Sequence, residues 1–558
     1  MVPPLVYLSA RTVVSDHGLS AVGLNCVPRE LYRPLLDAAL AHGRPLAVGE
    51  LVQRWPERTL SIGGRRSRCQ DPPSRLCVQA LLLAVVRGLS DKRCSLKVLD
   101  LCGLQCEDGH SEDAMGGWSL TVALCSTLLQ ARNITSASRG HRRDDRERKK
   151  RVLKPERDGD VGVKRDREGM ERCWGEKMEC VANGGPGRGT EGAENVKGIR
   201  RRMELQRKNE TQPQLIPSKV DSREDILVNV RADLFVNGRS WERVRAALSL
   251  AGPLRLHCRF LRVEELPAYS IVSLLHLLPQ DELLGLDVRY SSLGVSGLAL
   301  LLPQLTPFPR LSSLRLHYCN LDVQRSRPGQ QEALQEVSRG LGELKRLRRL
   351  SLTALRLPGH LRLLLSSLSE PLEALELPYL SLTSSDMAYL SHSPHASSLT
   401  ELDLSENKLD ESSLHSLRHL LSRAKRCLTR LSLCGCGLSD GPLGSVLPSM
   451  SQCQVLQSLR LALNPLSRAA LVDLARAVAG IHSLRLLLHP NALEDYEPGL
   501  PPLPSSAQLL DWPLNEGSEI RDVTLMQLEE VLRDEGRIGD LLMTSDLLKY
   551  STDLAMDD

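Results

Sequence analysis

The amino-acid sequence predicts an α/β solenoid, a horseshoe of strand–helix repeats with a parallel sheet on its concave side. Three observations carry this prediction. Leucine makes up about one in five of the 558 residues, whereas aromatic residues are only 3%. Apolar residues recur with one fixed spacing in the second half of the chain, and helical patterns fill the intervals between the copies. A core with so few aromatic side chains must be built from stacked leucines, which is typical of repeat proteins.

Residues 1–130 are predicted to be a helical N-terminal cap that leads into an irregular first repeat. Residues 28–42 and 76–89 have the apolar spacing of helices. Residues 95–101 then have the spacing that recurs later in the chain, with Leu96, Leu99 and Leu101 apolar. A cap is expected here because the exposed end of a repeat array must be covered by a polar-faced element.

Residues 131–220 differ in composition from the repeats. Between His141 and Glu210 there are 21 Lys and Arg against 15 Asp and Glu, and apolar residues are scarce. This composition is typical of disorder, so we predict a disordered basic insertion. Most mixed-charge runs of this kind are solvated linkers. The alternatives are a nuclear-import patch, an arm for nucleic acid, or a gene-model artefact in which non-coding sequence is read through.

Residues 221–500 are predicted to form the main solenoid. A strand over 225–236 and a helix over 240–250 resume it, and Leu254 and Leu256 begin another irregular copy. Regular copies follow, apolar at relative positions 1, 4, 6 and 11. They begin at Leu283, Leu311, Leu347, Leu372, Leu399, Leu428 and Leu456. A degenerate copy around Leu484 and Leu486 ends the series.

The copy from Leu399 to Leu409 shows most clearly that this pattern is the leucine-rich repeat. Positions 4 and 6 alternate on a short strand and point into the core. Position 9 lies where the chain turns, and an Asn or Cys there can hydrogen-bond the backbone of the turn. Four copies have such a residue, namely Cys319, Asn407, Cys436 and Asn464. Helical stripes over 412–424 and 468–479 lie between strands, so each repeat supplies a strand and a helix.

Residues 501–558 are predicted to be an acidic C-terminal cap and tail. Between Asp511 and Asp558 there are 13 acidic residues against 4 basic ones. Residues 521–535 have the spacing of an amphipathic helix. We expect this helix to close the C-terminal end of the core.

The concave face is the candidate interaction surface. Positions 3, 5 and 7 of each copy alternate away from the core, with positions 2 and 8 beside them. In two neighbouring copies these positions hold five acidic residues and no basic one, and the flanking copies carry arginines. Such a patch repels itself unless a cationic group docks on it, and tyrosines at position 8 would add apolar contact. The candidate contact residues are Glu373, Glu376, Glu401, Asp403, Glu406, Tyr290, Tyr318 and Tyr379. The competing interpretation is that exposed positions simply take polar residues.

The order of these segments resembles that of the leucine-rich-repeat-containing protein 14 family, which is similar to the PRAME family (preferentially expressed antigen in melanoma). The resemblance covers about 1–130 and 221–535 but not the insertion. The matching segments are Leu51–Pro56, Leu96–Leu104, Ala232–Val236 and Leu399–Leu409. It implies a cytoplasmic, non-enzymatic interaction protein. For the wider group it implies a substrate receptor of a cullin-RING ubiquitin ligase, or a regulator of signalling or transcription.

One family feature is incomplete in this chain. Receptors that dock elongin carry a short box of Leu, three residues, Cys and a further aliphatic residue. Only Leu254 to Cys258 has the first half, and Arg262 stands at the aliphatic place. Leu254 is also needed by the core. The ligase role is therefore implied by the resemblance alone, and the box does not support it.

No sequence motif indicates catalysis, a cofactor or a metal site. Cys102, Cys106 and His110 have helical spacing, but no second ligand pair accompanies them, which favours reduced cysteines over zinc. The 15 cysteines are an odd number, and the chain does not begin with the pattern of a secretory signal, so we expect reduced thiols in the cytoplasm or the nucleus. No apolar run reaches the ~18 residues of a membrane span.

The favoured function is therefore a non-enzymatic adaptor that binds a protein partner with a basic segment on the concave face. Cullin-RING ligase components are the partners that the resemblance implies. We expect the protein in the cytoplasm, with the nucleus as a second location. The alternative is a nuclear regulator of transcription that contacts nucleic acid through the basic insertion. Outside that insertion the chain is nearly neutral, which argues against nucleic acid as the partner.

Overall fold

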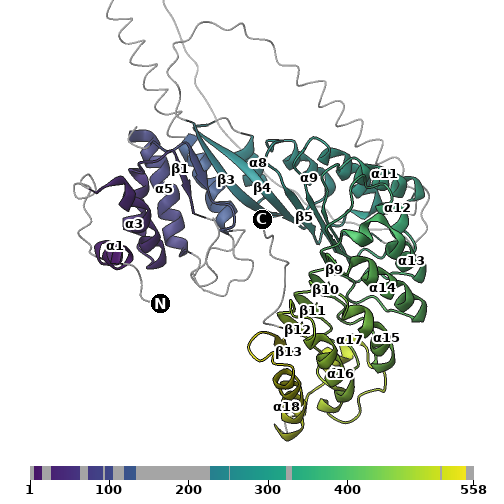
Figure 1. Ribbon diagram of the computed structural model, residues 1–558. Coiled ribbons are helices and arrows are strands. Elements are labelled where there is room, and N and C mark those ends of the chain that lie inside the picture. Colours follow the sequence, from purple (N-terminus) through teal and green to yellow (C-terminus); the bar gives the residue numbers. More distant parts are fainter. Residues whose placement is uncertain are drawn as a thin grey trace, which may run out of the picture. The chain divides into compact units, whose positions relative to one another are not determined.

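The computed structural model describes residues 5–15, 27–62, 73–91, 95–104, 119–132, 227–249, 252–321, 330–515 and 518–547. In these residues thirteen strands form one sheet, and each strand pairs in parallel with the next strand along the chain (Figure 1). Sequential parallel pairing is the topology of a solenoid, because each repeat contacts only its neighbours. The predicted fold class, a leucine-rich repeat solenoid with a parallel sheet, is confirmed.

The strands fall on the repeat pattern. They are β1 Thr59–Ser61, β2 Val98–Asp100, β3 Val228–Asn237, β4 Leu254–Glu264, β5 Gly285–Arg289, β6 Ser313–His317, β7 Arg349–Thr353, β8 Ala374–Glu376, β9 Glu401–Asp403, β10 Arg430–Ser432, β11 Ser458–Arg460, β12 Leu486–Leu488 and β13 Leu542–Thr544. Strands β5 to β11 begin two residues after the predicted first leucine of each regular copy. In the degenerate copy Leu487 and Leu488 are the buried residues of the strand, and Leu486 is only half-buried.

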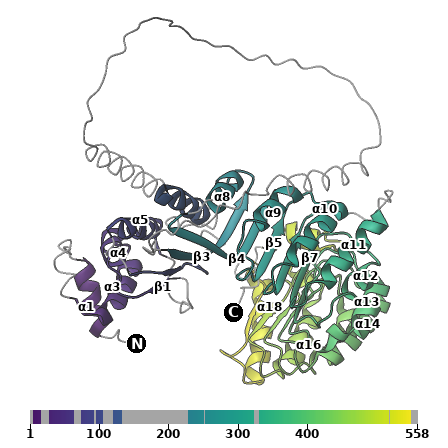
Figure 2. The same cartoon turned by 90° about the horizontal axis from the view of Figure 1, so that it is seen from above.

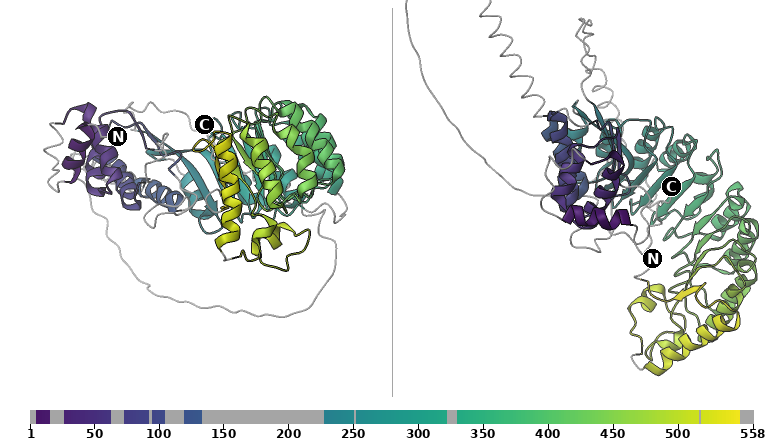
Figure 3. Two further views of the ribbon diagram at one scale, coloured as in Figure 1. Left: turned by 60° about the horizontal axis from the view of Figure 1, so that its bottom comes forward. Right: turned by 60° about the vertical axis from the view of Figure 1, so that its left-hand side comes forward.

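The first helices precede β1, and most of the later ones link successive strands on the outer side of the sheet, as Figures 2 and 3 show from two further directions. They are α1 Leu5–Ser15, α3 Arg29–Ala41, α4 Pro45–Gln53, α5 Arg75–Asp91, a helix over 119–132, α8 Trp241–Leu248, α9 Ala268–Leu275, α10 Gly294–Leu301, α11 Gln330–Gly342, α12 Leu361–Leu365, α13 Ser384–His392, α14 Glu411–Ala424, α15 Asp440–Met450, α16 Arg468–Ala479, α17 Ser506–Asp511 and α18 Ser518–Asp534. The helices predicted over 412–424, 468–479 and 521–535 correspond to α14, α16 and α18.

The core is a stack of leucines closed by hydrogen bonds at the turns. In the copy that begins at Leu399, Leu402 and Leu404 are at most 2% exposed. Asn407 at position 9 donates to the carbonyls of Leu377 at 2.8 Å and Leu404 at 2.9 Å. Two copies further on, Asn464 donates in the same way to the carbonyls of Leu433 and Leu461. In the copy between them, the thiol of Cys436 donates to the carbonyl of Leu404 at 3.3 Å. The predicted role of Asn and Cys at the turn is therefore confirmed.

The sheet continues across the insertion. Met1–Ala131 and Ile226–Asp558 form one compact unit. Strand β2 precedes the insertion and β3 follows it, and the two pair in parallel with Leu99 opposite Val230. The Gly103 amide donates to Asp233 at 2.8 Å, and the Phe235 amide donates to Thr121 at 2.9 Å. The predicted insertion 131–220 lies almost entirely outside the described residues.

The sequence pattern did not predict the two terminal strands, β1 and β13. Strand β13 falls inside the segment predicted as acidic cap and tail and pairs with β12. Just before it, the buried Arg537 donates to three backbone carbonyls, those of Ala479, Ile481 and Leu484, at 2.5 to 3.0 Å. Since these carbonyls lie at the end of α16 or just beyond it, a cation is well placed there, and Arg537 fixes the C-terminal segment to the last regular repeat.

Candidate protein-interaction surface

The feature that stands out on the sheet side is a row of residues in left-handed backbone, one at position 8 of each regular copy and one, Glu265, at the matching place in the copy before them. We call it the turn row. Its members are Glu265, Tyr290, Tyr318, Ala354, Tyr379, Glu406, Gly435 and Leu463, with φ between 51° and 63°. Most of their amides donate to the carbonyl at position 7 of the next copy, as Tyr290 does to His317 at 3.0 Å and Tyr379 does to Ser405 at 3.1 Å. The turn row therefore follows one end of the strands, and neighbouring members lie about one strand spacing apart, roughly 4.8 Å.

Three tyrosines of the turn row expose their rings. Tyr290 is 56% exposed, Tyr318 44% and Tyr379 49%. The rings of Tyr290 and Tyr318 stack with centroids 5.3 Å apart and an interplanar angle of 15°. Burial raises the pKa of Tyr318, and it raises that of Tyr379 to about 12 with help from the nearby Glu406. Both phenols therefore stay protonated at physiological pH.

Glu406 ends this exposed stretch of the turn row. It accepts a hydrogen bond from the Ser506 hydroxyl of α17 at 2.7 Å, and it also hydrogen-bonds Tyr379. Burial raises its pKa, which the two hydroxyl donors oppose. Its carboxylate lies against Gly435, where an added Cβ would come within 2.3 Å of Oε1. Glycine at that place is thus what allows Glu406 to lie along the row toward Ser506.

Two of the predicted acidic residues pair with arginines from neighbouring copies. Glu373 at position 2 forms an ion pair with Arg348 on the adjacent copy. Glu401 at position 3 is buried between Arg349 and Arg430, at 3.4 and 3.5 Å. The sequence argument treated these arginines as flanks of the patch, whereas parallel pairing brings them onto the acids.

Glu376 and Asp403 lie in a row of their own at position 5, facing each other across β8 and β9. Burial raises the pKa of both carboxyls. Arg315 opposes the effect on Glu376, and Arg460 together with hydrogen bonds from Ser405 opposes it on Asp403. These two acids belong to the half-buried floor of the sheet and present little surface to a partner.

The structure thus divides the eight predicted contact residues into two sets. The turn row holds Tyr290, Tyr318, Tyr379 and Glu406, whereas the other four acids lie on the strands or directly before them. Of these four, Glu373 and Glu401 pair with arginines, and Glu376 and Asp403 are half-buried. The repeat spacing placed the tyrosines on one rim, but it did not predict that their backbone is in the left-handed conformation. It also missed Ala354 as the gap in the row. Gly435 at position 8 was the available signal, because glycine is the usual residue where φ is positive.

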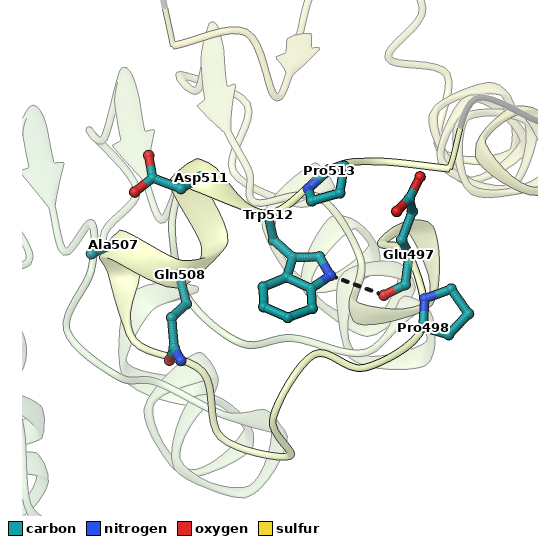
Figure 4. Close-up of a pocket in the computed structure, with 7 residues that line it drawn as sticks. All are labelled: Glu497, Pro498, Ala507, Gln508, Asp511, Trp512 and Pro513. Carbon is teal, nitrogen blue, oxygen red and sulfur yellow. Dashed lines mark hydrogen bonds between the residues drawn. The ribbon is translucent and has the colours of Figure 1, made fainter.

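A shallow groove of about 300 Å³ lies beside α17, where the C-terminal segment folds back (Figure 4). The Trp512 ring occupies its middle, and its Nε1 donates to the carbonyl of Glu497 at 3.1 Å. The groove is lined by Glu497, Pro498, Ala507, Gln508, Asp511, Trp512 and Pro513. None of these residues was singled out by the sequence.

Other predicted features bear on function as follows. Leu254, Leu256 and Cys258 are buried in β4, so the partial elongin box forms part of the core. Cys106 and His110 lie outside the described residues, and within the described residues no group of three potential metal ligands occurs. Likewise, no helix in the described part of the chain has the length and apolar character needed to cross a membrane.

Comparison with known proteins identifies the family. The PRAME N-terminal domain model matches residues 2–108 and the PRAME C-terminal domain model matches residues 246–500. Leucine-rich repeat-containing protein 14 of Xenopus laevis is 33% identical over 515 residues, 88% of this chain and 88% of that protein. Its Homo sapiens counterpart is 31% identical over 97% of each chain, and PRAME family member 12 of Homo sapiens is 25% identical over 89% of this chain and 86% of that protein. The fold and the relatives are typical of protein-interaction scaffolds, as the resemblance implied. The chain belongs to the leucine-rich repeat-containing protein 14 family and carries its PRAME N- and C-terminal domains.

Proposed function

We propose that this protein is a non-enzymatic adaptor that holds a protein partner on the sheet side of its solenoid, along the turn row. The observation that carries the proposal is the set of three exposed tyrosines at one repeat position in left-handed backbone. A bulky residue with positive φ is strained by about 1 kcal/mol or more. Asn or Gly would fit the turn better, so folding alone does not account for tyrosine there three times.

Exposed tyrosine is a favoured anchor at protein interfaces, because it combines a large apolar ring with a hydroxyl. The strands beside the row supply a charged but internally paired floor, for example Glu401 between Arg349 and Arg430. A floor of this kind contributes specificity more than affinity, because its charges already have partners. The tyrosines are then the residues that supply most of the binding energy.

The test compares the proteins labelled in cells by the full chain and by two variants, with a proximity-labelling enzyme fused to each. The first variant replaces Tyr290, Tyr318 and Tyr379 with Asn, which tolerates positive φ and removes the rings. The control replaces Tyr269, 57% exposed on the outer helix α9, with Ala. We expect the triple variant to lose the specific partners and the control to keep them, with melting temperatures close to that of the wild type. A triple variant that keeps every specific partner would contradict the proposed face.

Three finer assignments rest on other grounds. A substrate-receptor role in a cullin-RING ligase is supported by the family resemblance, but the buried position of Cys258 gives it no support. A nuclear role through the basic insertion rests on residues outside the described part of the chain. For localisation we propose the cytoplasm, because the odd number of cysteines in the chain, 15, favours reduced thiols, as in a reducing compartment. Cell fractionation tests this directly.

A further inference from the structure

The turn row contains one gap, and its position is specific. Tyr290 and Tyr318 are neighbours in the row and stack at 5.3 Å. Tyr379 is two places beyond Tyr318, and the place between them is occupied by Ala354, which has the same left-handed backbone. Two places correspond to roughly 10 Å. Because Ala354 carries only a methyl group, no long side chain of the row fills the space between Tyr318 and Tyr379.

We propose that this gap is a slot for a cationic side chain of the bound partner, arginine in preference to lysine, with Tyr318 and Tyr379 as its walls and Glu406 as its counter-charge. The inference rests on the proposed function and specifies the chemistry of the partner. A group in the middle of the slot would lie about 5 Å from each ring, within the ~6 Å over which a cation is attracted to an aromatic face. A planar guanidinium suits the space between two rings better than an ammonium group does.

The charge of the slot favours a cation over other occupants. Within the described residues, the hydrogen bonds to Glu406 come from hydroxyls, those of Ser506 and Tyr379, and no ion pair to it is formed. Its carboxylate acts on both Tyr318 and Tyr379 electrostatically, since it contributes to the raised pKa of each. An anionic side chain would be repelled, and an apolar one would bury Glu406 further without compensating its charge.

The row itself supplies the variants that test the slot. Ala354→Tyr fills the gap with a side chain that this left-handed position accepts in three other copies. Ala354→Asn keeps the gap largely open and also tolerates positive φ. Glu406→Gln removes the counter-charge, and Glu265→Gln makes the same change at the other end of the turn row, where φ is 55°.

The probe is a fluorescein-labelled peptide of four Gly-Ser-Arg repeats, with Gly-Ser-Glu repeats as the control, titrated with the full-length chain by fluorescence anisotropy at physiological salt. We expect the wild type to bind only the arginine peptide. We expect Ala354→Tyr and Glu406→Gln each to weaken binding about tenfold, the size of a desolvated cation–π or charge contact. Ala354→Asn and Glu265→Gln should bind like the wild type.

Equal binding of both peptides by the wild type, or an unchanged affinity for Ala354→Tyr, would overturn the slot. Failure of the slot and failure of the function are distinguishable. If the triple tyrosine variant loses its partners while Ala354→Tyr and Glu406→Gln keep them, the interaction face stands without the slot. If the triple variant keeps its partners, the proposed function fails whatever the peptide result.

Discussion

At the scale of single residues, the sheet floor carries carboxyls that weaken the fold at neutral pH. Glu376 and Asp403 face each other across two strands, and burial raises the pKa of both. Each is therefore harder to ionise in the folded chain than in the unfolded chain. Well below the usual carboxyl pKa both states are protonated and the groups do not affect stability. As pH rises through the folded-state pKa the ionised form penalises the folded state, so stability is lost toward neutral pH.

Replacing Glu376 with Gln should therefore stabilise the protein at neutral pH. The amide keeps the shape and the hydrogen-bonding capacity toward Ser351 and removes the buried charge. We expect the melting temperature to rise by about 1–3 °C at neutral pH, and the difference from the wild type to close as pH falls to about 4. Thermal melts of both proteins across this range measure it. Glu370→Gln, the same change at an exposed position, is the control; a lower melting temperature for Glu376→Gln at neutral pH would refute the sign.

At the scale of elements, the strands could be predicted wherever the leucine spacing is regular. Strands β5 to β11 all lie where positions 3 to 7 of a copy predict them. The terminal strands were missed for a physical reason. Each is three residues long with little apolar periodicity, and each is held by pairing with a neighbour, as Thr59 to Ser61 are by Val98 to Asp100. Such pairing is a tertiary contact that a local pattern does not reveal.

The candidate site also has features that the sequence could predict and features that it could not. The tyrosines at position 8 could be placed on one rim by counting, because the repeat fixes their register. The arginine partners of Glu401 could not, since Arg349 belongs to a copy two strands away and reaches Glu401 across Ala374. The left-handed backbone of the row also depends on hydrogen bonds to the next copy, which the sequence of one copy does not contain.

The turns link neighbouring elements, and Asn407 is the strongest such link that can be tested alone. Its side chain donates to Leu377 and Leu404 and accepts from the Leu382 amide at 3.1 Å, all of them buried. Asn407→Ala leaves the Leu377 carbonyl and the Leu382 amide without this partner, which should cost about 3 kcal/mol. Asn407→Cys should cost less, because the thiol of Cys436 makes one such bond at the equivalent place. Urea denaturation followed by circular dichroism gives both values; equal losses for Ala and Cys would show that packing, not hydrogen bonding, sets the requirement.

At the scale of the whole molecule, the solenoid does not depend on an uninterrupted chain. Residues 95–104 and 227–237, far apart in sequence, are neighbours in one sheet through β2 and β3. The bond from the Leu101 amide to the Arg231 carbonyl, 2.8 Å, and the bond from Gly103 to Asp233 extend this junction beyond the strands. The N-terminal PRAME domain is therefore joined to the repeats by the sheet as well as by the intervening sequence.

This arrangement predicts the result of limited proteolysis. Trypsin should cut first within residues 133–226, which are rich in Lys and Arg and poor in apolar residues, and later within 330–515. The two products should nevertheless elute together in size-exclusion chromatography without denaturant, because β2 and β3 remain paired after the cut. Addition of urea should separate them.

As a matched test of the junction, Leu99→Asp places a charge at a fully buried position of β2 and should release the N-terminal product after cleavage. The control is Lys97→Asp. Lys97 is exposed and lies two residues before Leu99, so this variant should leave the two products together. Early cleavage inside 330–515, or products of the wild type that separate without urea, would mean that the sheet does not hold the two segments as one unit.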